Sequence, residues 1–536
     1  MTTRELRTPI LVVGGGLGGV AAALAAAENG QRVVLTEQYR WLGGQSTSQA
    51  VPFDEHPWIE RFGGTRRYRR LRSGVRDYYR AHFPLTERSR NTPNLNPGAG
   101  VVSKLCHDPR VAVAVIDQLL LPHLVSGRIT VLQPVVPVAA DVDGDVVRAV
   151  TLRDEAGELI TVAADYVIDA TDTGELLPLT GTEYVTGFEA RAEHDEPSAP
   201  DTAQPMNMQA VSICFALEHV DGDHTIERPA GYDRWRDKQV DFWGDRQLSW
   251  TSPDPRTLEP VLRTFNPNPG DDVHTLETDQ SLGPGDTELW LFRRIAARDH
   301  FEPGFLASDI TMVNWAMIDY FDAPVIDVDD APQRLAEAKE LSASALYWMQ
   351  TEAPRADGGT GWPGLRLRPD VMGTDDGFAM APYYRESRRI KAVRTVTEND
   401  VSLTVRAGGR AADFHDSVGI GMYRIDLHPS TGGDNYIDVP ASPFQIPLGA
   451  LLPQRVRNLL PACKNIGTTH ITNGCYRLHP VEWNIGEVAG LLAATSLAEG
   501  TTPHQVRGDA DRLARFQDFL TGQGIELAWP DEVAGY

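Results

Sequence analysis

The chain has 536 residues, of which 50 are basic and 74 acidic, so its formal net charge is −24. This charge opposes binding to nucleic acid or anionic lipid, and we expect small-molecule or protein partners. The length predicts a large core divided between two or three domains. The four cysteines lie far apart without a CxxC pair, which favours a cytoplasmic protein without a disulfide framework or a metal site.

An apolar stretch at residues 10–27 follows Arg4 and Arg7 and ends in small residues, as a secretory leader would. However, it contains five glycines, each of which costs a helix about 1 kcal/mol relative to alanine. The glycines fall where a strand would turn into a helix, so we favour a strand, a glycine loop and a helix. No other stretch approaches eighteen apolar residues, and we expect no membrane span.

This stretch begins a pattern typical of a dinucleotide-binding βαβ unit. It predicts a strand, a glycine loop, a helix ended by Gly30 and a second strand, at residues 10–13, 14–19, 20–29 and 32–36. The glycines permit a tight turn and the approach of a pyrophosphate to the free N–H groups of the helix start. Glu37, at the end of the second strand, would bind ribose hydroxyls and disfavour a 2′-phosphate. A second GxGxxG match at 359–364 has no strand before it and contains a proline, so we predict a loop there.

The next predicted elements are two helices and three β segments. The helices are expected at 66–83 and 103–125, the second beginning near Ser103 or Asp108, and the β segments at 128–144, 146–154 and 158–171. The Arg- and Tyr-rich segment 66–83 has two interpretations. It is either a solvated or inter-element helix, or a face that recognises anions.

From residue 190 the composition shifts to Pro, Asp, Gly and Trp, which predicts a second domain or a large insertion. Long loops are expected at 193–205 and 266–286, a strand within 206–220, and helices at 333–351 and 482–500.

Five stretches together carry a resemblance to a known family: "VVGGGLGGVAAALAAAENGQRVVLTEQYRWLGGQST", "YVIDATDTGEL", "YYRESRRI", "SVGIGMYRIDLHPS" and "NLLPACKNIGTTHITNGCYRLHPVEWNIGEVAGLLAA". The chain resembles FAD-dependent oxidoreductases of the glutathione-reductase-like superfamily. More narrowly, it is similar to a bacterial group often named together with xanthan-lyase-type polysaccharide proteins. These stretches cover about a third of the chain, and residues 190–375 match no pattern that we can name.

The resemblance implies an α/β fold with a Rossmann-like FAD-binding domain of the glutathione-reductase type and a second α+β substrate domain. The FAD domain would be discontinuous, formed by residues 1–65, 100–190 and 445–500. Residues 190–445 would form the substrate domain with its long loops, and residues 500–536 a C-terminal helical extension.

The resemblance also assigns cofactor-binding residues by position. The pyrophosphate would lie on the glycine loop, the adenosine ribose on Glu37, the adenine on the backbone of Val136, and the diphosphate and flavin edge on residues 44–46. The full set is Gly14, Gly16, Leu17, Gly18, Gly19, Glu37, Gln38, Gly44, Gln45, Ser46, Val136, Ala170, Thr171, Asp172, Asn484, Ile485 and Gly486. Asp172 stands where the family pattern has glycine, which puts the close approach of FAD at that point in question.

The helix after Pro480 has a physical argument of its own. Reduced flavin carries negative charge near its N1 and C2 carbonyl, which a helix N-terminus stabilises. Proline suits a first helical position, and Asn484 to Gly486 would then lie nearest the ring. The alternative is an ordinary buried helix.

Oxidation of an alcohol or amine also needs a base near the flavin, and histidine suits that role at neutral pH. We expect His470 and His479, with Arg477 between them, to form part of the active-site wall, although either histidine could instead make a structural hydrogen bond. The other candidates are Glu482, which could merely cap the helix, and His428. Arg385 and Arg477 are the candidates for substrate binding, although "RESRR" also suits a buried ion-pair network between domains.

We therefore expect an FAD enzyme that oxidises, desaturates or hydroxylates a small polar metabolite, such as a sugar or a secondary-metabolite intermediate. Without a second nucleotide pattern, the electron acceptor would be oxygen, a quinone or a separate reductase. The alternatives are a flavin monooxygenase that needs an external reductant and a non-redox binding protein with the same fold. The sequence is compatible with a homo-oligomer and identifies no substrate.

Overall fold

The computed structural model describes residues 4–276, 285–406 and 408–533. Part of the loop expected at 266–286 lies outside these ranges. Within them, no helix is both long enough and apolar enough to cross a membrane.

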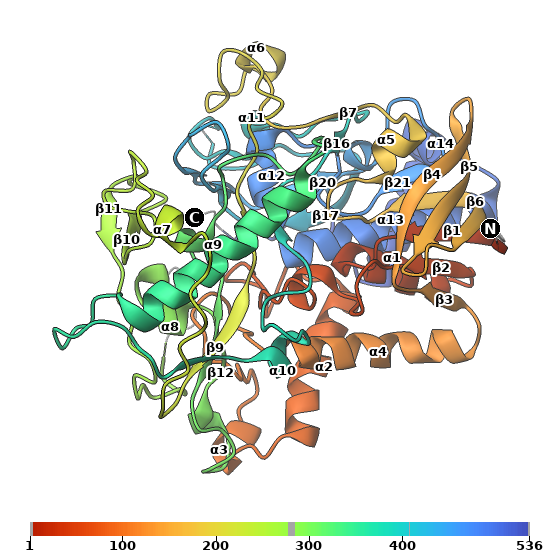
Figure 1. The fold of residues 1–536 in the computed structure, drawn as a ribbon. Helices are drawn as coiled ribbons and strands as arrows, with labels where there is room; N and C mark the ends of the chain where they lie inside the picture. Colours follow the sequence, from red (N-terminus) through yellow and green to blue (C-terminus); the bar gives the residue numbers. More distant parts are fainter. Residues whose placement is uncertain (1–3, 277–284, 407, 534–536) are drawn as a thin grey trace.

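A seven-stranded sheet organises the N-terminal part of the fold (Figure 1). In parallel pairing, β1 (Arg4–Val13) lies between β2 (Val33–Thr36) and β6 (Leu159–Asp169), and β3 (Ile129–Leu132) extends the sheet beyond β2. α1 (Leu17–Glu28) connects β1 to β2, which confirms the predicted βαβ unit. β1 begins six residues earlier than predicted because β6 pairs with it along almost its whole length.

The three predicted β segments after residue 128 form the other side of this sheet. β4 (Val135–Asp143) and β5 (Val146–Asp154) pair antiparallel with each other, and β5 pairs with the first half of β6. The last residues of β6 pair in parallel with β21 (Leu459–Pro461). The carboxyl ends of β1, β2, β6 and β21 therefore meet at one edge of the sheet.

Two helices cross beside this edge with their backbones in contact. α13 (His479–Glu499) begins as predicted, with Pro480 in its first turn. A Cβ atom on Gly486 would lie 2.0 Å from the carbonyl oxygen of Gly18 in α1, and one on Gly490 would lie 2.3 Å from that of Ala22. Glycine at these positions of α13 therefore permits the close crossing with α1.

The second part of the fold has its own aromatic core and lies on the other side of the molecule in Figure 1. Its four-stranded sheet has the order β12 (Arg294–Ala296), β13 (Ile310–Val313), β9 (Phe215–His219), β14 (Leu365–Leu367). α9 (Ala331–Thr351) confirms the predicted helix. The strand predicted within 206–220 is present but divided in two, because β8 (Val211–Ser212) pairs with β15 (Tyr383–Tyr384) whereas β9 pairs with β13.

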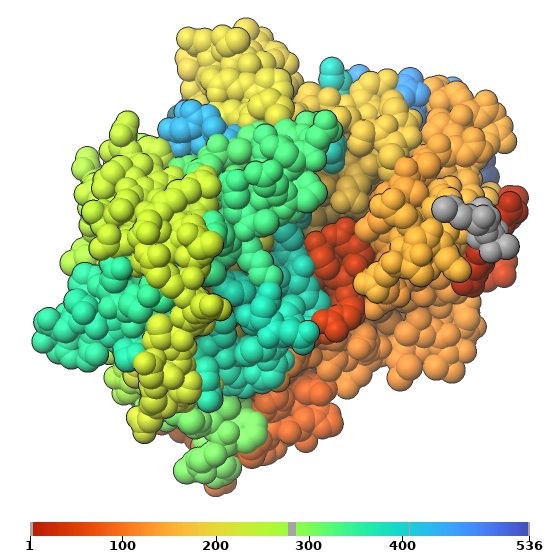
Figure 2. Space-filling view, in the orientation of Figure 1, coloured from red at the N-terminus to blue at the C-terminus, as the bar shows by residue number. Residues whose placement is uncertain are grey.

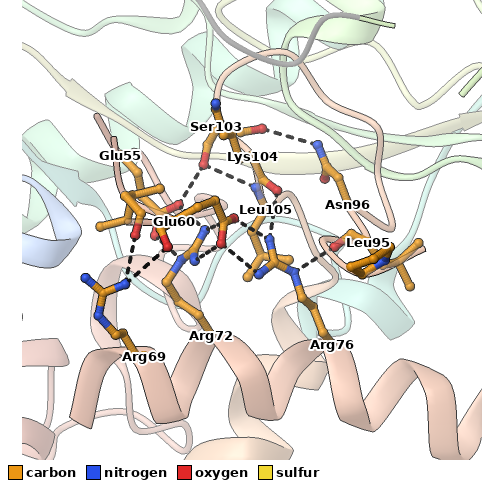
Figure 3. Close-up of polar contacts among 12 residues, drawn as sticks. Glu55, Glu60, Arg69, Arg72, Arg76, Leu95, Asn96, Ser103, Lys104 and Leu105 are labelled. Carbon is orange, nitrogen blue, oxygen red and sulfur yellow. Dashed lines mark hydrogen bonds and ion pairs between the residues drawn. The ribbon is translucent and has the colours of Figure 1, made fainter. Parts of the chain in front are cut away.

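The Arg-rich helix α2 (Arg66–His82) directs Arg72 and Arg76 into the protein (Figure 3), whereas Arg66 and Arg70 are exposed. Arg72 forms ion pairs with Glu55 and Glu60, and Arg76 pairs with Glu60 and donates to the carbonyl of Leu95. These guanidinium groups are buried and already bound by acids of the chain. α2 is thus an inter-element helix, and the interpretation as an anion-recognising face was wrong.

The helix predicted at 103–125 and the helical C-terminal extension also have counterparts in the structure. α4 (Pro109–Val125) begins directly after Asp108, whose side chain caps it. α14 (Pro503–Gly508) and α15 (Ala510–Gln523) form helical structure at the C-terminal end of the chain. Residues 359–364 form a loop, as predicted.

Candidate active site

A cleft opens where the strand ends of the large sheet meet. Gly14, Glu37 and Ala170 directly follow β1, β2 and β6, so three loops converge at this edge, as in other dinucleotide-binding sheets. Figure 2 shows a red N-terminal patch on the surface between orange and teal segments. The cleft is lined by Val13, Gly14, Gly16, Thr36, Glu37, Gln38, Tyr39, Val135, Pro137, Ala170, Thr171, Asp172, Thr173, Glu175 and Tyr384.

The glycines of the loop differ in the physical reason for which a side chain is excluded. Added Cβ atoms on Gly14, Gly18 and Gly19 would lie 2.3, 1.7 and 1.9 Å from backbone oxygens, so packing of the protein excludes side chains there. A Cβ on Gly16 would meet its nearest atom only at 3.5 Å. Packing within the protein therefore does not explain Gly16, whereas the close approach of a ligand would.

Two helix N-termini converge beside Gly16. The N–H of Gly18 in the first turn of α1 donates to Oε1 of Glu482 at 3.3 Å, and Glu482 belongs to the first turn of α13. Nζ of Lys464 lies 3.9 Å from Oε2 of the same carboxylate. Helix N-termini and an ammonium group all favour negative charge, and the carboxyl group of Glu482 lies at this point.

Glu37 lies at the end of β2 with its carboxylate against the glycine loop. It accepts hydrogen bonds from the backbone N–H groups of Gly15, Gln38 and Tyr39. Burial raises the pKa of Glu37 to about 7, although these hydrogen bonds oppose the rise.

The other residues assigned to the cofactor lie around this cleft or in elements that pack next to it. Gly44, Gln45 and Ser46 form the 3-10 turn η1 (Gly44–Ser46), and a Cβ on Gly44 would lie 2.9 Å from Cα of Gly16. Val136 lies between two residues that line the cleft. In α13, Asn484 donates to the carbonyl of Val418, Ile485 is buried, and Gly486 packs on α1.

Asp172 has a role that glycine could not fill. It pairs with Nζ of Lys464 at 2.7 Å and accepts a hydrogen bond from Gln49 at 2.9 Å. Asp172, which stands where the family pattern has glycine, therefore supplies the counter-charge of buried Lys464.

A family model described as FAD dependent oxidoreductase matches residues 9–520. The chain belongs to this family. It is an enzyme, and its cofactor is FAD. The cleft fits this cofactor, because Gly16 leaves room for close approach and two helix N-termini meet beside it.

Solved structures resemble this oxidoreductase only distantly. The flavin-dependent brominase Bmp2 matches 96% of this chain and 84% of its own, with 10% identity and a TM-score of 0.35. Quinol fumarate reductase FrdA of E. coli matches 97% of this chain and 74% of its own, with 11% identity and a TM-score of 0.33. An L-proline dehydrogenase from P. horikoshii has 14% identity and a TM-score of 0.18 over 36% of this chain, which spans only 26% of that enzyme. Scores at this level carry no argument about activity, and no curated protein matches the sequence.

A second, larger cavity of about 300 Å³ lies next to the cleft. The two are separated by β15, in which Tyr383 lines the cavity and Tyr384 lines the cleft. Gln45 of η1 also donates to the carbonyl of Arg477, a residue of the cavity wall. The polar lining includes Asp54, Asp254, Arg256, Arg263, Asp286, Arg293, Asn314, Tyr383, Arg385, Tyr423, Arg424, Asp426, His428, Tyr436, Asp438 and Arg477.

Three residues singled out from the sequence meet in this cavity, namely Arg385, His428 and Arg477. Nδ1 of His428 lies 2.6 Å from Oδ2 of buried Asp319, whose Oδ1 binds Ser212 and Arg385. Although burial acts to raise it, Arg385 and His428 hold the pKa of Asp319 below its ordinary value. We therefore assign the proton of the pair to Nδ1 of His428, which leaves Nε2 as an acceptor.

The environment keeps His428 neutral. Burial lowers its pKa, and Arg385 lowers it further, although Asp319 opposes the change. Its Nε2 lies 3.8 Å from Oδ2 of Asp426, which also lines the cavity.

The other two histidines lie in different surroundings. Nδ1 of His479 accepts a hydrogen bond from the N–H of Asp54, and burial lowers the pKa of His479 to about 3. Nδ1 of His470 lies 3.0 Å from Glu386. Neither is among the residues that line the cavity. Glu386 also pairs with Arg389, so the ion-pair network expected for "RESRR" is confirmed.

Sequence reasoning did not single out Arg293, Asn314 or Asp319, although the first two line the cavity and the third supports His428. All three lie in the segment without a recognisable pattern. The one signal was an acid within the otherwise apolar run "WAMIDYF", since a buried acid needs a partner.

Proposed function

We propose that this enzyme oxidises a small polar alcohol or amine bound in the 300 Å³ cavity. The observation that carries the proposal is the His428–Asp319 pair in the cavity wall. Bound FAD would supply the hydride acceptor. The cavity shares β15 with the FAD cleft, which supports a substrate bound beside the cofactor.

The residues of the cavity have distinct tasks in this proposal. Nε2 of His428 takes the proton from the substrate hydroxyl or amine as hydride leaves the adjacent carbon. Asp319 fixes the orientation of the imidazole and stabilises the positive charge that it gains. Arg293, Arg385 and Arg477 in the lining orient the substrate. Oxygen, a quinone or a separate reductase would serve as the final electron acceptor.

The test uses the full-length, FAD-loaded enzyme under anaerobic conditions. We expect a small alcohol or amine to bleach the flavin, and His428→Asn to slow this reduction by about 10²- to 10⁴-fold without loss of FAD. His82→Asn is the matched control, because His82 is exposed at the end of α2.

The same anaerobic flavin-reduction assay distinguishes the proposed function from the alternatives. Rapid bleaching by NADPH or NADH, with none by alcohols or amines, would favour a monooxygenase that needs an external reductant. Equal reduction rates in the wild type and His428→Asn would remove His428 as the base. Because the chain belongs to an oxidoreductase family, the alternative function as a non-redox binding protein has no support.

A further inference from the structure

Three arginines in the cavity wall keep one buried, unpaired donor atom each. Within the described residues, Nε of Arg293, Arg385 and Arg477 has no hydrogen-bond partner. Their terminal nitrogens are engaged by the protein, with Asp54 3.6 Å from Arg293, Asp319 3.0 Å from Arg385 and Asp426 3.2 Å from Arg477. All three arginines line the cavity.

The three guanidinium groups form one cluster. Asn314 joins the first two, since Arg293 donates to its carbonyl at 2.8 Å and Arg385 to its Oδ1 at 3.3 Å. Tyr383 joins the other two, since Arg477 donates to its hydroxyl at 3.3 Å and Cζ of Arg385 lies 5.0 Å from its ring centroid.

Two more donors next to this cluster are also unpaired. Within the described chain, Nδ2 of Asn314 and Nε1 of Trp315 have no hydrogen-bond partner, and both residues line the same cavity. A buried N–H group without a partner destabilises the folded protein. Five such groups in the wall of one cavity point to a ligand that brings acceptor atoms.

The charges of the lining limit what this ligand can be. Six arginines and five aspartates line the cavity, so the arginine charge is largely compensated. Asp319 adds a sixth carboxylate beside Arg385, so a dianion would meet net repulsion from the aspartates. A carboxylate has one charge, and its two oxygens accept from guanidinium groups in a planar arrangement.

We propose that the substrate is a small carboxylic acid whose carboxylate binds Nε of Arg293, Arg385 and Arg477 together with the Asn314 amide. The alcohol or amine to be oxidised would then lie toward His428. That second statement rests on the proposed function, whereas the carboxylate site stands without it.

The test is calorimetric titration of the FAD-loaded enzyme with sodium acetate at constant ionic strength. Acetate is small enough to enter the site whatever the rest of the substrate is, and acetamide is its neutral isostere. We expect saturable binding of acetate and at least about tenfold weaker binding of acetamide, because charge-assisted hydrogen bonds are lost. Inorganic phosphate at pH 8, mainly a dianion, should bind more weakly than acetate.

Lysine variants locate the site. Arg385→Lys and Arg477→Lys keep the positive charge but remove the Nε donor, and we expect each to weaken acetate binding by about tenfold. Arg424→Lys is the matched control. Arg424 lines the same cavity, but its Nε already donates to Asp438.

The proposal is overturned if acetate does not bind, if acetamide binds equally well, if phosphate binds more tightly, or if Arg424→Lys weakens binding as much as the other two variants. The acetate and acetamide comparison uses the wild type, so it holds even where a variant does not fold. Acetate binding without flavin reduction by any alcohol or amine would contradict the proposed function alone. Flavin reduction by neutral substrates without acetate binding would contradict the carboxylate site alone.

Discussion

At the scale of single residues, the glycine loop shows that one motif combines two physical demands. Gly14, Gly18 and Gly19 are required by backbone oxygens at less than 2.5 Å from any added Cβ, whereas Gly16 has space around it. The sequence pattern treats these positions alike. Only the structure separates the glycines needed for folding from the one that a ligand would need.

We therefore expect Gly16→Ala and Gly18→Ala to fail in different ways. Gly16→Ala should keep the thermal unfolding midpoint of the apoprotein within a few degrees of the wild type but weaken FAD binding, because the methyl group takes the space of the cofactor. Gly18→Ala places a Cβ 1.7 Å from the carbonyl oxygen of Ala462 and should destabilise the fold by at least about 1–3 kcal/mol.

Thermal unfolding of the apoproteins and FAD titration of each variant check this prediction. Equal loss of stability in the two variants would show that Gly16 is also a packing position.

At the scale of elements, a buried acid ties three short segments together. Oε1 of Glu196 accepts from the N–H of Glu398, at the start of α11 (Glu398–Val401), and from the hydroxyl of Thr469, the N-cap of α12 (His470–Tyr476). Burial raises the pKa of Glu196 to about 7. Both hydrogen bonds use one oxygen, so glutamine can preserve them.

Glu196→Gln should change how stability depends on pH. The folded protein retains a proton on Glu196 that the unfolded chain has already lost, so rising pH favours unfolding of the wild type. Its free energy of unfolding relative to Glu196→Gln should fall from about pH 4.5 to about pH 7, by on the order of 3 kcal/mol, and then stay level.

Denaturant unfolding of both proteins at several pH values measures this difference. A difference that is constant with pH, or that increases as pH rises, would contradict the raised pKa.

The elements that could be predicted are those with local signals. The glycine spacing, the β-rich runs and Gly30 at the end of α1 specify the βαβ unit within about thirty residues. The strand predicted within 206–220 is two strands in the structure, because pairing partners, not local pattern, divide it. Arg67, Arg72 and Arg76 of α2 gave no indication of their partners, since the acids that bind them come from other parts of the chain.

The site was predictable to a similar extent. The cleft loops follow strands of the motif, so Gly14, Gly16 and Glu37 could be named as a group. The cavity instead collects residues from Asp54 to Arg477, and Arg293 comes from a segment without a pattern. Convergence over such distances in sequence follows from tertiary packing, which no local spacing encodes.

At the scale of the whole molecule, β15 lies between the cleft and the cavity. The strand ends of the large sheet form the cleft, beside the N-termini of α1 and α13. Residues from the N-terminal part and from the second part of the fold line the polar cavity. Tyr383 and Tyr384 face opposite sides, as neighbouring strand residues do. The arrangement thus places the cleft and the 300 Å³ cavity on the two faces of one short strand.

The most direct test of this account is the visible absorption spectrum of the purified full-length protein, recorded before and after acid precipitation. We expect flavin bands that move to the supernatant, because the cleft would hold FAD through hydrogen bonds and charge. A protein without these bands, even after FAD is added, would contradict the assignment of the cleft to FAD.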